Sequence, residues 1–151
     1  MIKDQLRKLG NFFQRLELLK LKVNYEHTKT EKEGPVSAST IEAIKNSIAN
    51  RWPLYMYYIG DKEIAPGYRW VEPYTYGLSK FTGNQLLRAY QYKGVSTSIT
   101  EGFKTFRLDR IRNTAPLTSK HFDKPRPLWS GGGDLLMSSI YLDVLFPDSN
   151  E

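Results

Sequence analysis

Hydrophobic positions recur with two different periods along the chain, and the period changes near residue 54. Before that point, apolar side chains recur at steps of three and four, the spacing of one face of an α-helix. After it, aromatic and branched residues alternate with polar ones in short runs bounded by glycines, which is typical of antiparallel strands. The pattern therefore predicts helices followed by a β-sheet.

The first predicted helix covers residues 2–23 and is amphipathic. Only Lys20 interrupts its apolar series, which is Ile2, Leu6, Leu9, Phe13, Leu16 and Val23. Three heptads are too few to require a coiled coil. Its apolar face can pack on its own domain, on a second copy of the chain, or in a groove of a partner protein. The polar stretch 27–35, which ends in Gly-Pro, is interpreted as a linker.

A second, shorter helix is predicted directly before the strands. Ser39 and Glu42 have the spacing of a capping box, and Pro53 prevents the helix from continuing. The three isoleucines at 41, 44 and 48 form one apolar stripe.

Four strands are predicted, at residues 54–60, 67–77, 84–94 and 102–111. The intervals leave no room for crossover helices, so a meander that bends into a small barrel is expected. Residues 119–134 are rich in Pro and Gly and are interpreted as a loop. The apolar run 135–146 is either a further strand that completes the barrel or a docking helix, and periodicity alone does not decide.

These elements divide the chain into three parts. Residues 1–35 form the N-terminal helix and linker, residues 36–123 the barrel domain, and residues 124–151 a C-terminal loop with an apolar segment. No stretch has the roughly 20 apolar residues that cross a bilayer, and the first residues do not resemble a signal peptide. A cytoplasmic protein that makes no membrane contact is expected.

Positive charge is concentrated in one part of the sequence. The formal net charge is +6, and residues 80–112 hold seven Lys or Arg against two acids, a net charge of +5. Local charge of one sign favours an anionic partner, because electrostatic attraction is screened over about 8 Å in physiological salt. A basic surface that is merely solvated is the alternative.

Strand alternation predicts where these charges lie. Along residues 84–92, Leu87 and Ala89 share one side, while Arg88 and Tyr90 share the other. Arg88 and Tyr90 are therefore expected to lie together on the side away from the core.

The segment 105–111 breaks the alternation. Phe106 and Leu108 share a side opposite Arg107, but Ile111 falls out of step. A bulge or turn at residues 109–110 would bury both Leu108 and Ile111 and would redirect Arg110. Arg88, Arg107 and Arg110 are thus expected to converge beside Tyr90.

Arginine beside tyrosine suits a nucleotide or a single-stranded nucleic acid. A guanidinium group can bind two phosphate oxygens through two parallel hydrogen bonds, and an aromatic ring stacks on a base. The candidate ligand-binding residues are Arg88, Arg107, Arg110, Lys104, Tyr76 and Tyr90. Tyrosines that pack at the edge of a core, and arginines that extend over apolar surface, are the structural alternative.

Catalytic and metal-binding patterns are lacking in the sequence. Cysteine is absent, which excludes a disulfide framework and thiolate metal sites. His27 and His121 are isolated, and no nucleophile elbow, phosphate-binding loop or dinucleotide fingerprint occurs. A protein that is not an enzyme and that uses no cofactor or metal is expected.

Several of these segments, in their order, resemble the WYL domain of bacterial regulators and of CRISPR and phage-defence proteins. They are "IEAI", "RWVEPY", "GNQLLRAYQYKG" and "FRLDRI", followed by Phe122, and they span about residues 40–122. The tripeptide that names the family is replaced by Gln85-Leu86-Leu87. The resemblance implies a strongly bent, five-stranded antiparallel Sm-like barrel preceded by one or two helices. It also implies ligand sensing at a basic and aromatic patch, with Arg107, Arg110 and Arg88 at the matching positions.

Two functional hypotheses follow. In the first, the barrel is a regulatory module that binds single-stranded nucleic acid or a phosphorylated nucleotide. In the second, it is an accessory factor of a phage or CRISPR defence system that docks a larger protein through its terminal helix and C-terminal apolar segment. An Sm-like RNA-binding ring is a weaker third hypothesis, because such rings need exposed strand edges. Sequence-specific reading of a duplex is not expected, since one helix and a linker precede the barrel in place of a winged helix-turn-helix.

Overall fold

The computed structural model of the chain describes residues 36–95, 101–129, 131 and 134–147, together with positions 2, 3, 5, 7, 8, 10 and 11. These seven N-terminal positions are helical, and the remainder of the helix predicted at 2–23 and the linker predicted at 27–35 lie outside the described residues. Within the described part, no helix is long and apolar enough to cross a membrane.

The predicted short helix is α2, Ala38–Asn50. Its cap is Ser37, whose Oγ accepts a hydrogen bond from the Thr40 amide at 3.1 Å, so the capping box expected at Ser39 was placed two residues too late. The helix ends as expected just before Pro53, with Arg51 in the left-handed region at φ 54°. Ile44 and Ile48 are buried.

Six antiparallel strands form one sheet. They are β1 (Leu54–Tyr58), β2 (Gly67–Ser79), β3 (Gln85–Gly94), β4 (Gly102–Arg107), β5 (Ile111–Pro116) and β6 (Met137–Asp143). The order is β4-β3-β2-β1-β5, and β6 pairs with β2. The described strands β4 and β5 end this path without pairing to each other, so the sheet is mainly antiparallel β but not a closed barrel. It has six strands where the WYL resemblance implied five.

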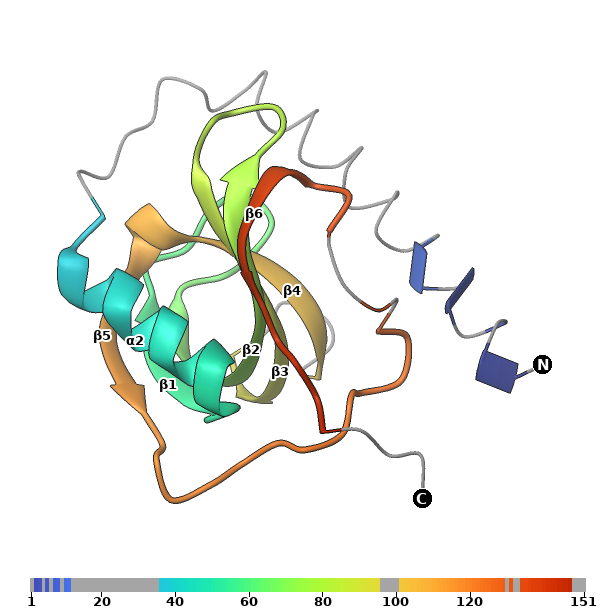
Figure 1. Cartoon of the computed structure of the whole chain (residues 1–151). Helices are drawn as coiled ribbons and strands as arrows, with labels where there is room; N and C mark the ends of the chain where they lie inside the picture. The colour runs from blue at the N-terminus through green and yellow to red at the C-terminus, as the bar shows by residue number, and fades with distance from the viewer. Residues whose placement is uncertain are drawn as a thin grey trace.

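The long strand β2 organises the sheet. Its first half, up to Val71, pairs with β1, and its second half, from Thr75, pairs with β6, while β3 follows the opposite edge. Figure 1 shows the resulting curved sheet, with α2 lying across it and β6 running beside β2.

The strand predicted at 102–111 is interrupted, for the expected reason. A single 3₁₀ turn, η1 (Leu108–Arg110), follows β4, and it lets both Leu108 and Ile111 reach 1% exposure. The predicted turn is confirmed, but the chain then continues as β5, which the sequence analysis did not separate. Within the undecided run 135–146, Met137–Asp143 form a strand, β6, and not a helix.

The core lies between α2 and the sheet, and Tyr74 of β2 is one of its fully buried residues. The Tyr74 ring contacts Phe103, Phe122, Trp129 and Phe146 at centroid distances of 4.7 to 5.6 Å. Its hydroxyl accepts a hydrogen bond from a backbone amide at residue 126, and burial raises its pKa. The chain after β5 is therefore part of the same core.

Replacing Gly77 by Ala tests how closely β6 packs on β2. An added Cβ would overlap the carbonyl oxygen of Ser139 and the Sδ of Met137. We expect Gly77→Ala to lower the free energy of unfolding by about 2 to 3 kcal/mol, measured by urea denaturation.

The control for this change is Gly83→Ala. Nothing lies within 4 Å of an added Cβ at Gly83, so only its φ of +71° opposes the substitution. A cost of about 1 kcal/mol is expected there. Equal costs at the two glycines would contradict the close approach of β6.

Candidate functional site

Alternation along β3 and β4 places two of the predicted arginines on one side of the sheet. The register pairs Leu86 with Arg107, Arg88 with Thr105 and Tyr90 with Phe103, and directly opposite residues share a side. We call these six residues the arginine face. Arg88 and Arg107 therefore lie on the same side of the sheet, as the sequence predicted, but Arg107 is four residues along β4 from Phe103, the partner of Tyr90.

Arg88 is buried within this face. It is 4% exposed, its Nη1 donates to Thr105 Oγ1 at 2.9 Å, and its guanidinium carbon lies 5.4 Å from the centre of the Phe103 ring. Its Nε lies 3.9 Å from Asp134 Oδ2. Burial lowers the pKa of Arg88 to about 10, against the opposing effect of Asp134. Arg88 is thus a buried cation and is not exposed on the surface where a ligand could bind it directly.

Asp134 belongs to the segment that covers Arg88. Its side chain is fully buried, Oδ1 accepts from the Leu136 amide at 2.8 Å, and Oδ2 accepts no hydrogen bond from a described residue. Burial raises the pKa of Asp134, and the Arg88 charge opposes that shift. Leu136 and Met137 form a small cluster with Leu86. The sequence analysis missed Asp134, because a lone acid after a glycine run gives no sign of its distant partner.

Arg107 and Arg110 are held by different partners. Arg107 binds Asp109 through two parallel hydrogen bonds of 3.0 and 2.7 Å, and it is half-buried. Arg110 is 6% exposed and donates to the carbonyl oxygen of Gly60, so it anchors the turn after β1. The structure therefore does not bring Arg110 onto the arginine face in the way that the sequence predicted.

Lys104 and Tyr76 also lie outside the arginine face. Lys104 is opposite Ala89, on the core side of β4, where burial and then the Arg69 charge lower its pKa. Tyr76 is opposite Leu87, is 5% exposed, and donates its hydroxyl hydrogen to Gln85 Oε1.

Tyr90 is bordered by a cation from a segment that the sequence analysis treated as a loop. The Arg126 guanidinium carbon lies 4.5 Å from the Tyr90 ring centre, and Arg126 binds Glu72 through two hydrogen bonds of 2.9 Å. The Tyr90 hydroxyl donates to Glu101 at 3.3 Å. Arg88, Arg107 and Arg126, on and beside the arginine face, are thus each paired with a carboxylate.

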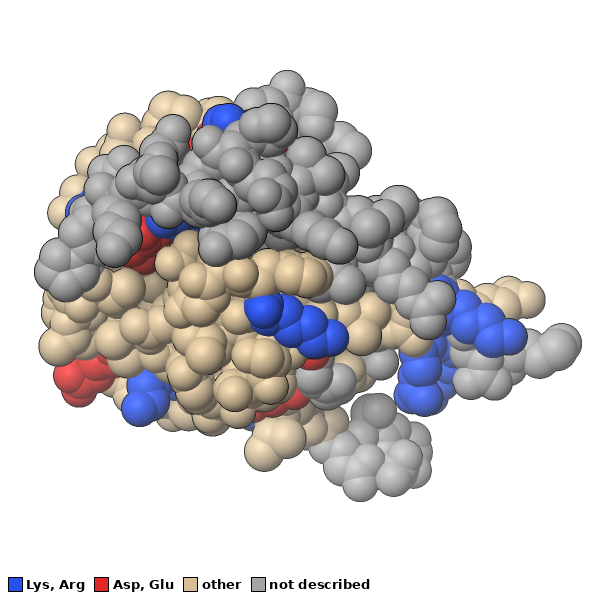
Figure 2. All heavy atoms as spheres, turned by 90° about the horizontal axis from the view of Figure 1, so that it is seen from above, with Lys and Arg blue, Asp and Glu red and all other residues tan. Residues whose placement is uncertain are grey.

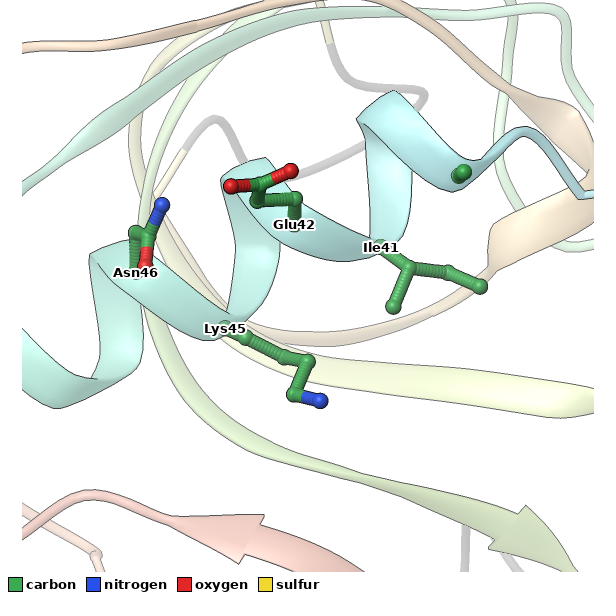
Figure 3. Close-up of a pocket in the computed structure, with 5 residues that line it drawn as sticks. Ile41, Glu42, Lys45 and Asn46 are labelled. Atoms are coloured by element: carbon green, nitrogen blue, oxygen red, sulfur yellow. The ribbon is translucent and has the colours of Figure 1, made fainter.

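The hollow found on the described surface lies on the helix and not on the sheet. A shallow hollow along α2 is lined by Ala38, Ile41, Glu42, Lys45 and Asn46, and Figure 3 shows Ile41 and Lys45 extending to one side of the helix, away from Glu42. On the side seen in Figure 2, Lys and Arg lie at separate places, several of them beside Asp or Glu. The described residues contain no group of three His, Asp or Glu side chains placed to hold a metal ion.

Comparison with known proteins identifies no family for the chain and one distant structural likeness. No family model matches the chain. No curated protein matches it either. Among solved structures, the chain is similar to proteasome accessory factor B/C (PafBC) of Arthrobacter aurescens, with 13% identity and a TM-score of 0.48 over 83% of this chain and 20% of that one. The chain spans about a fifth of that protein, and a likeness this distant carries no argument about function. The WYL resemblance therefore remains a hypothesis based on the sequence motifs.

Removing Arg88 leaves the Asp134 carboxylate buried without a partner charge. The free energy of unfolding of the variant should then depend on pH. In Arg88→Met, Asp134 is left buried without its cation, and its pKa rises further above the value of about 3.9 in the unfolded chain. The folded state then binds the proton more tightly, so the penalty is absent at low pH and grows as pH rises. We expect a loss of about 3 kcal/mol at pH 7 and a smaller loss at pH 4, relative to wild type in urea denaturation.

The double variant Arg88→Met/Asp134→Leu is the control for this prediction. It removes both charges and keeps apolar volume, so it should recover most of the lost stability. A double variant as unstable as the single one, or a loss that is equal at both pH values, would contradict the pairing.

Proposed function

We propose that the chain is a non-enzymatic regulatory module that senses a phosphate-bearing ligand, a single-stranded nucleic acid or a phosphorylated nucleotide, at the arginine face. Arg107 and Arg88 would contact the phosphate, and Tyr90 would border the bound base. Arg110, Lys104 and Tyr76 would contribute to the fold, since their contacts lie elsewhere. The position of Arg88 and Arg107 on one side of neighbouring strands supports this assignment.

The contact between Asp134 and Arg88 is the observation that carries the proposal. Its separation of 3.9 Å exceeds the usual 2.7 to 3.2 Å of a hydrogen bond, and Asp134 Oδ2 accepts no hydrogen bond from a described residue. A phosphate that approached the guanidinium more closely would form a stronger, charge-assisted pair. The Asp134 carboxylate thus lies where a ligand phosphate would bind, but too far from the Arg88 guanidinium for a hydrogen bond.

Displacement of Asp134 from Arg88 by a ligand would also change the position of β6. Asp134 precedes β6 by three residues, and Leu136 and Met137 pack on Leu86 of the arginine face. A ligand that displaced Asp134 would favour a state in which this segment and β6 are repositioned. Binding at the face would thereby change the surface of β6, which is what a sensor requires.

Arg107→Ala tests the site directly. We expect binding of fluorescently labelled single-stranded oligonucleotides, or of a cyclic nucleotide, to weaken about 10-fold or more in fluorescence anisotropy or calorimetry, because a charged hydrogen-bond donor is lost. Wild-type affinity should fall as salt rises. Asp109→Asn should strengthen binding, since it removes the carboxylate that competes for Arg107.

The matched control is Arg51→Ala. Arg51 is also a partly exposed arginine paired with an aspartate, Asp123, but it caps the end of α2. Its removal should leave affinity unchanged. Unchanged binding in Arg107→Ala would exclude the arginine face as the ligand site.

A second candidate function is docking of a larger protein through β6, as for an accessory factor of a defence system. Ile140, Tyr141 and Leu145 are 39%, 51% and 80% exposed, and β6 pairs with β2 alone among the described strands. An open, apolar strand edge is suited to pairing with another chain.

Ile140→Lys tests the docking function. We expect the variant to keep its ligand affinity and thermal stability but to lose a dimer or a co-purified protein partner, as measured by light scattering and mass spectrometry. Loss of ligand binding together with the partner would show that the two functions are not separate.

A further inference from the structure

Four aromatic side chains share the outer side of β1 and β2. The register pairs Tyr55 with Trp70 and Tyr57 with Tyr68, so all four point the same way. The intervening positions of β1, at 54, 56 and 58, are fully buried, which places the core on the opposite side. We call Tyr55, Tyr57, Tyr68 and Trp70 the aromatic face.

The rings of the aromatic face form one continuous row. Tyr55 lies 4.6 Å from Trp70 and 5.3 Å from Tyr68 between ring centres, and Tyr57 lies 4.9 Å from Tyr68. None of the four belongs to the buried core, and Tyr68 is 44% exposed. Tyr55, Tyr57 and Trp70 are partly exposed, so the row forms one continuous apolar patch on the surface. A contiguous apolar patch on the surface of a soluble domain marks an interaction site.

Positive charge borders this row. Lys93 of β3 is exposed, lies opposite Trp70, and holds its Nζ 4.7 Å from the centre of that ring. Arg112 of β5 lies opposite Tyr57 on the other border. Among the described strands, no register partner of the four rings is a carboxylate. The arginine face differs in this respect, because carboxylates bind its arginines.

We propose that the aromatic face binds the unpaired bases of a single-stranded nucleic acid, with Tyr68 as the principal stacking ring and Lys93 on a phosphate. Every base offers a flat π-surface, so a row of rings beside a cation binds single strands with little dependence on sequence. A duplex keeps its bases stacked inside and cannot use these rings. An apolar protein partner fits less well, because the row consists of tyrosines and a tryptophan beside a lysine and contains no aliphatic side chain.

This inference does not depend on the arginine face. Its rings lie on β1 and β2, its residues are different ones, and it assigns a different contact, base stacking in place of phosphate exchange. The aromatic positions were visible in the sequence as alternating rings in "LYMYY" and "GYRW", but alternation explained them equally well as strand formers.

Substitutions at Tyr68 distinguish stacking from simple apolar contact. With labelled oligothymidylate or oligouridylate in fluorescence anisotropy, Tyr68→Ala should weaken binding about 5- to 150-fold. Tyr68→Phe keeps the ring and should bind within about twofold of wild type. Tyr68→Leu keeps apolar area without a ring and should bind as weakly as the alanine variant.

Tyr141→Ala is the matched control for Tyr68. Tyr141 is a tyrosine of similar exposure, 51%, but it lies on β6, outside the aromatic face. Its replacement should leave affinity unchanged. All variants should show the wild-type thermal transition, since exposed side chains contribute little to the core.

Lys93→Gln tests the phosphate contact. One phosphate contact fewer should reduce the slope of log affinity against log salt by about 0.7, the value for single strands. Lys45→Gln, on the exposed side of α2, should leave the slope unchanged.

The results separate this inference from the proposed function. Loss of binding in Tyr68→Ala with no loss in Arg107→Ala would support the aromatic face and reject the arginine face, and the reverse result would do the opposite. Tight binding by Tyr68→Leu, equal binding of a duplex, or no binding of any oligonucleotide would overturn the inference.

Discussion

The fold depends on the burial of Tyr74, at the point where β2 changes its neighbour. The register of β2 against β3 shifts at this residue, and the partner on the other edge changes from β1 before it to β6 after it. A bulge bends the strand and increases its twist, so the two halves of β2 can belong to one curved sheet. The rings around Tyr74 come from β4 and from the chain after β5. That packing places Arg126 over Tyr90 and positions Phe103 beside Arg88.

Charge that is concentrated in the sequence is not concentrated in space. Of the basic residues between 80 and 112, Arg88 is buried against Asp134, Arg107 is bound to Asp109, and Lys104 lies on the core side. Lys93 is exposed over an aromatic ring, with no carboxylate among the register partners of the rings beside it. An anion that approaches the arginine face must compete with internal carboxylates, whereas one that approaches the aromatic face meets a cation at its border. The two surfaces therefore favour different modes of binding.

Alternation predicted much of the fold, because it records which side of each strand is apolar. The first three strands and the turn after β4 followed from it, the turn because Leu108 and Ile111 both had to be buried. Alternation placed Arg88 and Arg107 on one side, but it could not show what covers that side. Asp134 and Arg126 arrive from segments without periodicity, so their contacts follow from the packing of the whole chain. The helix cap was misplaced because Ser37 and Ser39 are equally suitable residues and only the backbone geometry selects one.

Because β6 pairs with only half of β2 among the described strands, it can separate from the sheet without breaking the other strand pairings. Along β2, β6 is attached from Thr75 to Ser79, and β1 holds the other half independently. Tension applied to β6 would therefore separate one ladder of backbone hydrogen bonds while the remaining five strands, β1 to β5, kept their own pairings. A domain built in this way can release its last strand as a local opening, at a lower free energy than unfolding the whole domain.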